Sequence, residues 1–248
     1  MRKSYRELTE EIKTDGERLK LIAALGSSDD LAYHYALISE DWAAGGTLML
    51  ENSFDRHGEA GIVFLLKRLR AFGTASKTDA SAAAGTGAYT DTAYLAAKIL
   101  SQLRHRDFYA ARAKELAALL TARWGISDIA LRRKQIIALG WIGSEAELDV
   151  LIGTMQGDTD ALCRAWAAAA LMQLSFHAVD AAFLREKTKT AFAEAIQKEG
   201  DLRAAGIMLE AAQTLFGKKW ISAAAAEAAE PAAIEKAKKS ALRFLGKA

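Results

Sequence analysis

Residues 131–143 read LRRKQIIALGWIG, and two later stretches repeat the same pattern. They are residues 162–171, LCRAWAAAAL, and residues 202–209, LRAAGIML. Each stretch opens on a leucine with an arginine within two residues, and continues with small and apolar side chains at helical spacing. The opening leucines lie 31 and 40 residues apart. Repeats at this interval indicate a fold built by stacking one unit.

Each repeated stretch is followed by a second segment in which apolar residues recur at helical spacing. These segments are Glu145 to Met155, Ala181 to Gln197 and Lys219 to Ala229. Upstream, residues 94–103 and 107–121 form another pair of the same kind. Helix pairs repeated at this length are typical of a solenoid, in which each unit buries its apolar side against the next. We therefore expect an all-α fold, a right-handed α-α superhelix of about five or six helix pairs.

The composition and the local helix signals also favour helix along the whole chain. There is a single proline, alanine and leucine are abundant, and runs of β-branched residues are almost absent. Ser4 and Ser144 are each followed three residues later by a glutamate, which is the spacing of a capping box. Pro231 suits the first turn of the last helix. Glycines at three expected helix ends predict left-handed caps: Gly143, Gly200 and Gly217.

We expect one domain over residues 1–248, with repeats of uneven regularity. Residues 1–75 form irregular N-terminal helices, and residues 76–90 form a loop of small side chains. Residues 91–230 contain the clearer repeats, and residues 231–248 form a basic capping helix. That last segment carries five cations against one glutamate. A charge run of this kind on a terminal helix predicts a solvated face.

Residues 131–174 resemble HEAT repeats, in particular the short bacterial HEAT-like type. In that family a helix ending in Ala-Leu-Gly-x-Ile-Gly is followed by a second helix, an acidic turn and the next arginine-bearing helix. The residues that match these places are Ala138, Leu139, Gly140, Ile142, Gly143, Asp158, Asp160 and Arg164. The resemblance implies a binding scaffold, often for another protein. The residues themselves agree, because glycine and alanine allow close helix approach, while aspartate and arginine in successive turns can bond across repeats.

Six residues of the repeats are candidates for binding a partner: Arg132, Arg133, Trp141, Arg164, Trp166 and Arg203. The sequence leaves two interpretations open for the arginines. They form either an internal ladder tied to acidic turns such as residues 158–160, or a basic stripe that meets an acidic partner. The tryptophans are either buried between helix layers or exposed as hot spots for a partner.

No catalytic motif is complete in this sequence. His57 and Glu59 form the H-x-E of zinc deaminases, but a single cysteine cannot supply the two that this chemistry needs. Cys163 lies in a repeat helix and is expected to be a small buried apolar residue. Four residues between helices form either a metal site or a polar, solvated turn: Glu51, Asp55, His57 and Glu59. We expect no cofactor and no metal.

An enzymatic alternative is a DNA glycosylase acting on alkylated bases, because HEAT-like glycosylases are also short α-solenoids. Such enzymes hold a cationic base with aromatic residues beside a carboxylate, and grip the DNA backbone with arginine and lysine. Trp124 and Asp128, followed by Arg132 and Arg133, superficially resemble that set. In the family, however, the aromatic and acidic pair precedes the arginine pair by a whole repeat, whereas here the two pairs are adjacent.

The charge and the apolar stretches of the chain limit the partners and the cellular compartment that we expect for it. Among 248 residues, 33 are basic and 31 acidic, so the formal charge of +2 argues against a general affinity for nucleic acid. The start of the chain does not read as a secretory signal, and residues 165–179, the longest stretch without a charge, fall short of the roughly 20 apolar residues that span a bilayer. We therefore expect a cytoplasmic protein, without membrane contact, that binds another protein on its concave face. Its expected role is that of an adaptor, a toxin-immunity partner or an assembly chaperone.

Overall fold

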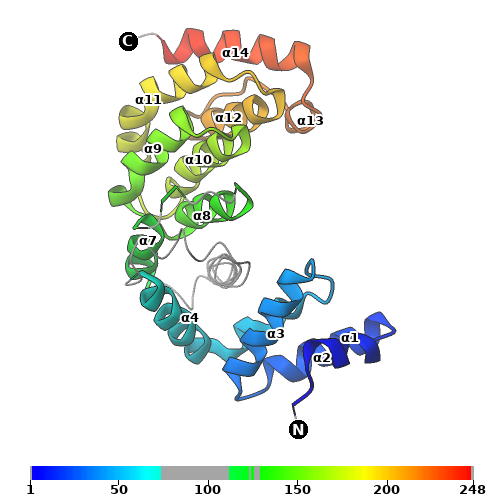
Figure 1. The fold of residues 1–248 in the computed structure, drawn as a ribbon. Coiled ribbons are helices and arrows are strands. Elements are labelled where there is room, and N and C mark those ends of the chain that lie inside the picture. The colour runs from blue at the N-terminus through cyan, green and yellow to red at the C-terminus, as the bar shows by residue number, and fades with distance from the viewer. Residues whose placement is uncertain (1, 74–111, 123, 126–128, 247–248) are drawn as a thin grey trace. The chain divides into compact units, whose positions relative to one another are not determined.

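The structure of the chain is all-α in the part that it describes. A computed structural model describes residues 2–73, 112–122, 124–125 and 129–246 (Figure 1). These residues form α-helices and two 3-10 helices, and no strand occurs among them. The fold class predicted from the sequence is therefore confirmed.

The chain divides into two compact units, Met1–Tyr109 and Ala110–Ala248. A single domain over residues 1–248 stays a prediction. The expected loop at residues 76–90 and the expected helix at residues 94–103 lie outside the described part of the chain.

The described part of the first unit is a group of short helices around a 3-10 segment. In chain order the elements are α1 (Tyr5–Glu11), α2 (Asp15–Gly26), α3 (Leu31–Ala43), η1 (Leu50–His57) and α4 (Gly58–Gly73). Helix α1 begins as predicted, since Ser4 and Glu7 form a reciprocal capping box. The 3-10 helix η1 packs against α2, α3 and α4, and it contributes the fully buried Leu50 and Phe54 to the core.

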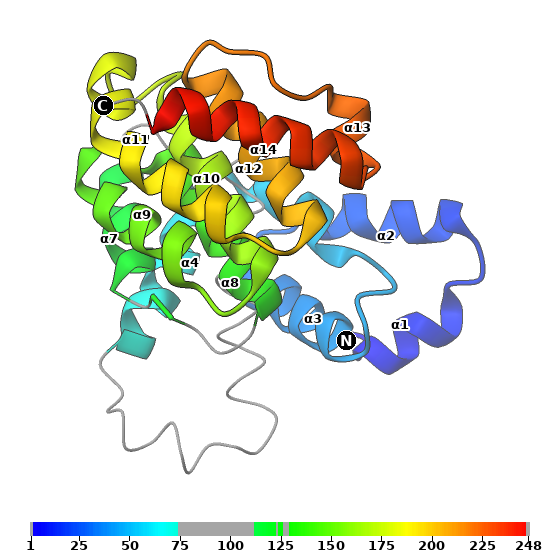
Figure 2. The same ribbon diagram turned by 90° about the horizontal axis from the view of Figure 1, so that it is seen from above.

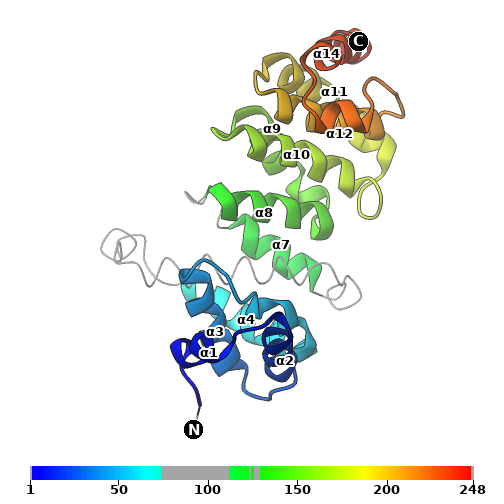
Figure 3. The ribbon, with the colours of Figure 1, turned by 90° about the vertical axis from the view of Figure 1, so that its right-hand side faces the viewer.

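The second unit stacks its helices in two rows. The first row consists of α8 (Ile129–Ile142), α10 (Ala161–Leu174) and α12 (Leu202–Leu215). Helix α10 lies in the middle and packs against both of its neighbours in this row, and Figure 3 shows the three helices in succession. Helix α7 (Ala113–Thr121) packs against α8. The three repeated stretches of the sequence are therefore the first row.

The second row contains one helix after each first-row helix, which in the third pair is not the next helix in the sequence. Its members are α9 (Leu148–Gly157), α11 (Ala181–Lys198) and α14 (Pro231–Leu245), with α11 in contact with both others (Figure 1). Before α9 the chain forms the 3-10 helix η3 (Glu145–Glu147), opened by the predicted capping box of Ser144. The predicted second helices are thus confirmed for the first two pairs. In the third, the expected helix at residues 219–229 shrinks to α13 (Ala223–Glu227), and α14 takes its place against α11 and α12 (Figure 2).

Aspartate side chains start three helices of the second unit. Asp160, Asp180 and Asp201 each accept a hydrogen bond of 2.8 Å from the backbone N–H three residues further on. At the helix ends, Gly217 has a φ of +63° and forms the predicted left-handed cap of α12. Gly143 and Gly200 do not adopt positive φ, so the caps predicted there are wrong. Before Gly200, residue Glu199 already leaves α11 in an extended conformation.

Candidate functional site

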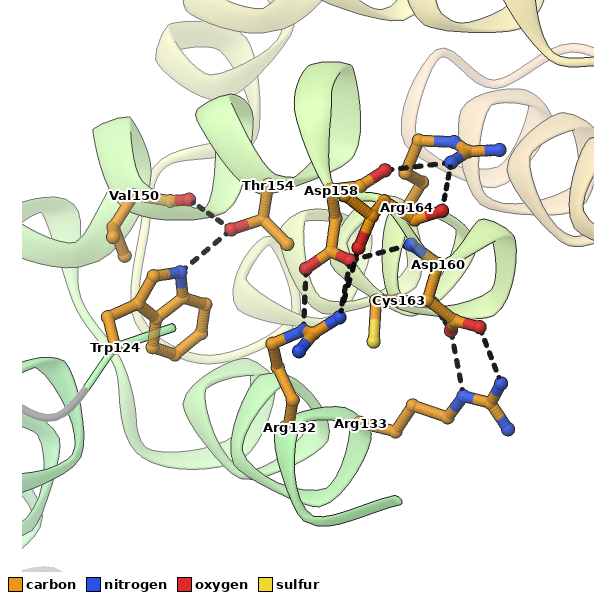
Figure 4. A network of polar contacts seen from close by, with 10 residues as sticks. Trp124, Arg132, Arg133, Val150, Thr154, Asp158, Asp160, Cys163 and Arg164 are labelled. Atoms are coloured by element: carbon orange, nitrogen blue, oxygen red, sulfur yellow. Dashed lines mark hydrogen bonds and ion pairs between the residues drawn. The ribbon is translucent and has the colours of Figure 1, made fainter. Parts of the chain in front are cut away.

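Arg132 and Asp158 form a bidentate ion pair between α8 and the turn that follows α9. Arg132 donates from Nε to Oδ2 at 2.8 Å and from Nη2 to Oδ1 at 3.0 Å (Figure 4). Each of the two side chains is only 10% exposed. Two parallel charge-assisted bonds give both strength and a fixed geometry. The pair therefore ties α8 to the turn from which α10 starts.

The next repeat contains the same kind of bridge. Arg164 of α10 donates to the two carboxylate oxygens of Glu199 at 2.8 and 2.9 Å, and Glu199 is 3% exposed. A further bond of 2.7 Å runs from Nη1 of Arg164 to the backbone oxygen of Asp158. The bond to the Glu199 carboxylate raises the pKa of Arg164 above its ordinary value. One guanidinium thus connects two successive turns.

The two bridges occupy equivalent places in their repeats. Arg132 and Arg164 are each the fourth residue of a first-row helix. Asp158 and Glu199 are each the C-cap residue of the second-row helix before the next turn. Each acid also accepts the backbone N–H two residues further on, at 2.8 and 2.9 Å. One carboxylate therefore satisfies both an arginine and the turn, which is the internal ladder that the sequence left open.

Arg203 lies outside this ladder. The fourth residue of α12 is Ala205, so the equivalent place carries no arginine. Arg203 is exposed, and no ion pair of this residue occurs within the described part of the chain. An alignment on the opening leucines hides this difference, because α8 and α10 begin before their leucine whereas α12 begins at Leu202.

Arg133 and Asp160 form a second bidentate pair in the first of these turns. Arg133 donates to Asp160 at 2.9 and 2.8 Å, while Asp160 also caps α10 through the N–H of Cys163. These interactions, of which the bond from Arg133 is the largest, hold the pKa of the Asp160 carboxyl well below its ordinary range. Three of the four predicted arginines are therefore engaged within the fold.

Acid is expected to remove the stabilisation that Asp160 provides. Because its pKa is lower in the folded than in the unfolded chain, this contribution is complete above the unfolded value of about 4 and is lost as the pH falls through the folded value. We expect Asp160→Asn to lower the free energy of unfolding at neutral pH and to flatten its decline in acid. Urea unfolding over a pH series measures both. Asp180→Asn is the control, because asparagine keeps the cap of α11 and no ion pair is lost; equal pH slopes for wild type and Asp160→Asn would contradict the prediction.

The outer side of α8 exposes large apolar side chains. Ile129, Ile137 and Trp141 are 44%, 37% and 41% exposed and follow one another at multiples of four residues. Residues at this spacing lie along one side of a helix. Trp166 of α10 is half-buried. Trp141 is therefore not buried between the helix rows.

A second exposed aromatic side chain, missed in the sequence, lies near the end of α8. Phe176, in the turn after α10, is 61% exposed. Its neighbour His177 donates from Nε2 to the backbone oxygen of Gly140 at 3.0 Å, which fastens this turn one residue away from Trp141. The sequence signal that could have revealed Phe176 is its place between Ser175 and His177, just after a run of apolar residues at helical spacing ends.

Trp124 lies at an open pocket of about 500 Å³ against α9, with Gly153 and Gly157 among the lining residues. Its indole Nε1 donates to Oγ1 of Thr154 at 2.9 Å (Figure 4). Asp128, the carboxylate of the glycosylase alternative, lies outside the described residues. The arginines that this alternative needs for gripping DNA are held by Asp158 and Asp160, so the geometry gives it no support.

His57 was expected in a solvated turn or a metal site, but it contacts a buried histidine. His57 Nε2 lies 2.8 Å from Nδ1 of His34, which is fully buried. His34 Nε2 lies 3.0 Å from the backbone oxygen of Leu50 and donates to it, so His34 Nδ1 accepts from His57. Burial lowers the pKa of His57. Within the described residues, no three His, Cys, Asp or Glu side chains are placed to hold a metal ion.

Cys163 is buried in α10, as predicted. Burial, together with the neighbouring Asp160, raises the pKa of its thiol to about 11. Since the thiolate is the reactive form of cysteine, this side chain serves packing at neutral pH.

Two rows of paired helices, joined by equivalent arginine–carboxylate bridges, define the second unit as an α-solenoid. Residues 81–172 match the family model of HEAT repeats. This part of the chain is therefore similar to HEAT repeats, in agreement with the resemblance of residues 131–174. Comparison with curated proteins and with solved structures gives no match. Of the helices that the structure describes, none combines the length and the apolar character needed to cross a membrane.

Proposed function

We propose that this chain is a protein-binding scaffold whose partner contacts the outer side of α8 and α10. The observation that carries the proposal is the exposed apolar line of Ile129, Ile137 and Trp141, with Phe176 near its end. HEAT repeats generally mediate protein–protein interaction. Stacked repeats suit this role because their exposed residues are not needed for the core.

The contrast between the two helix rows supports the choice of face. In the described helices of the second row, Phe183 is the one large apolar side chain that is clearly exposed. The exposed residues of α11 instead carry charges of both signs, such as Glu186 and Lys187. Exposed aromatic residues are enriched among the hot spots of protein interfaces. The first row therefore offers the better binding surface.

The roles of the six candidate residues differ within this proposal. Trp141 is the proposed anchor, Trp166 is a half-buried residue of α10, and the exposed Arg203 is available for contact on α12. The proposed role of the ladder is to keep the helices under this surface in place, through the ion pairs of Arg132, Arg133 and Arg164. An adaptor, a toxin-immunity partner and an assembly chaperone would all use such a surface, and binding on the concave face stays a prediction.

Loss of Trp141 and Phe176 is expected to weaken partner binding strongly. In an affinity pull-down from the native host with nuclease treatment, Trp141→Ala combined with Phe176→Ser should reduce recovery of a stoichiometric protein partner by about tenfold or more, because truncated hot spots cost at least 1 kcal/mol each. Phe183→Ser is the matched control, since it removes an exposed phenylalanine from the other row. Equal recovery with all three proteins, or recovery of nucleic acid alone, would refute the proposal.

A further inference from the structure

Three exposed cations form a line along the outer side of α14. Lys236, Lys239 and Arg243 are separated by three and four residues and therefore lie on one side of the helix. The opposite side packs Ile234, Ala237 and Ala241 into the unit, against α11 and α12. Figure 2 shows α14 lying along these two helices. Its charged side therefore faces outward.

Two lysines from the loop after α12 extend this line. Lys218 and Lys219 are exposed, and the Nζ atom of Lys218 lies 4.7 Å from the ring centre of Phe244, next to Arg243 in the sequence. We call the resulting set the basic stripe: Lys218, Lys219, Lys236, Lys239 and Arg243. None of its members forms an ion pair within the described part of the chain.

Helix α14 contributes one acidic residue beside the basic stripe. Glu235 is the single acid of α14, and its carboxylate lies 3.8 Å from Lys238. Lys238 itself is mostly buried and donates to the backbone oxygen of Glu199 at 2.8 Å, so it belongs to the packing and not to the stripe.

The neighbouring helix of this row carries charges of both signs, unlike the exposed side of α14. On the neighbouring α11, Arg185, Glu186 and Lys187 alternate in sign, and Lys187 pairs with Asp149 at 3.0 Å. A terminal repeat needs a polar outer face, which a mixture of charges would provide. Like charges at three- and four-residue spacing instead repel one another. The basic stripe is therefore more than a solvated cap requires.

We propose that the basic stripe binds an acidic segment of a protein partner, at a second surface separate from the apolar face of α8. Charge complementarity selects carboxylates as the matching groups. The apolar side of α14 is used for packing, so the helix cannot insert into a bilayer as a free amphipathic helix would. Five cations are fewer than the roughly 6–10 phosphate contacts typical of DNA-binding proteins. Trp220 and Phe244 beside the stripe are half-buried against each other, 5.8 Å apart, and offer no open face for base stacking.

The test is fluorescence anisotropy of a labelled polyglutamate peptide at low salt, with the full chain. The variant Lys236→Glu, Lys239→Glu and Arg243→Glu should bind the peptide about tenfold or more weakly, because each change replaces an attraction by a repulsion. The control variant reverses three exposed lysines of the first unit, Lys13→Glu, Lys20→Glu and Lys67→Glu, and makes the same change in net charge. It should bind like the wild type. Added salt should weaken the wild-type complex, since exposed charges are screened.

Several results would overturn the proposal. Equal losses in the two triple variants would show that net charge alone attracts the peptide. Tighter binding of a short DNA duplex, or co-sedimentation with phosphatidylserine vesicles in preference to the peptide, would assign the stripe to nucleic acid or to membrane. Circular dichroism melting checks that the stripe variant folds, and a charge-neutral variant, Lys236→Gln with Lys239→Gln, repeats the test if it does not. Trp141→Ala should leave peptide binding unchanged, which separates this surface from the proposed scaffold face.

Discussion

Replacing Arg132 by alanine should destabilise the protein by about 3–5 kcal/mol, the cost of leaving one member of a buried ion pair without its partner. Asp158 is 10% exposed and receives two bonds from Arg132. Without the guanidinium, the Asp158 carboxylate retains the hydrogen bond that it accepts from the backbone N–H of Asp160. Urea unfolding followed by circular dichroism measures the loss.

The matched control for this change is Arg203→Ala. Arg203 belongs to the same set of repeat arginines but is exposed on α12, so its loss should change the free energy of unfolding by less than about 0.5 kcal/mol. A double-mutant cycle of Arg132→Ala with Asp158→Ala isolates the energy of the pair itself. If Arg132→Ala and Arg203→Ala were equally mild, the bridges would not be holding the repeats together.

Replacing Gly140 by leucine should destabilise the protein by about 1–3 kcal/mol through overpacking. A Cβ atom at Gly140 would lie 2.9 Å from the Cα atom of Ala170, so even the first added carbon meets backbone of the neighbouring helix. Backbone cannot rotate aside as a flexible side chain does, and α8 and α10 would have to move apart. Thermal and urea unfolding measure the effect.

The comparison for Gly140 is Gly153→Ala on α9. A Cβ atom there meets nothing within 4 Å, and the position lies inside a helix, where alanine is favoured over glycine by about 1 kcal/mol. Gly153→Ala should therefore raise stability, whereas Gly140→Leu lowers it. If Gly140→Leu left the free energy of unfolding unchanged, α8 and α10 would not approach each other this closely.

The repeats and most helix starts were predictable because they depend on neighbours in the sequence. Ser4 and Ser144 form their capping boxes with residues three positions away, and Pro231 starts α14 in its first turn. The end of α11 was harder, because an extended Glu199 ends that helix without a left-handed glycine. The expected helix at residues 219–229 failed in part for a tertiary reason, since α14 fills that place in the row.

The candidate surface was less predictable than the fold. Helix α8 has apolar residues around much of its circumference, so periodicity did not tell which of them face outward. Ile136 and Leu139 are fully buried while Ile137 and Trp141 are exposed, although all four are large apolar residues. The chain segments packed around α8 decide between them. Phe176 lies in a turn that is positioned by the hydrogen bond from His177 to the backbone oxygen of Gly140. No short sequence pattern encodes that contact.

The sequence by itself determined the all-α class, the period of the repeats and their similarity to HEAT repeats, because these rest on helical spacing and on local capping. It also placed arginines and acids in successive turns, without deciding whether they face each other or a partner. Only the tertiary structure decided this, by setting Arg132 against Asp158 and Arg164 against Glu199 while leaving Arg203 exposed. The physical reason is that each bidentate bond joins residues 26 or 35 positions apart, and only the packing of successive repeats brings such residues together.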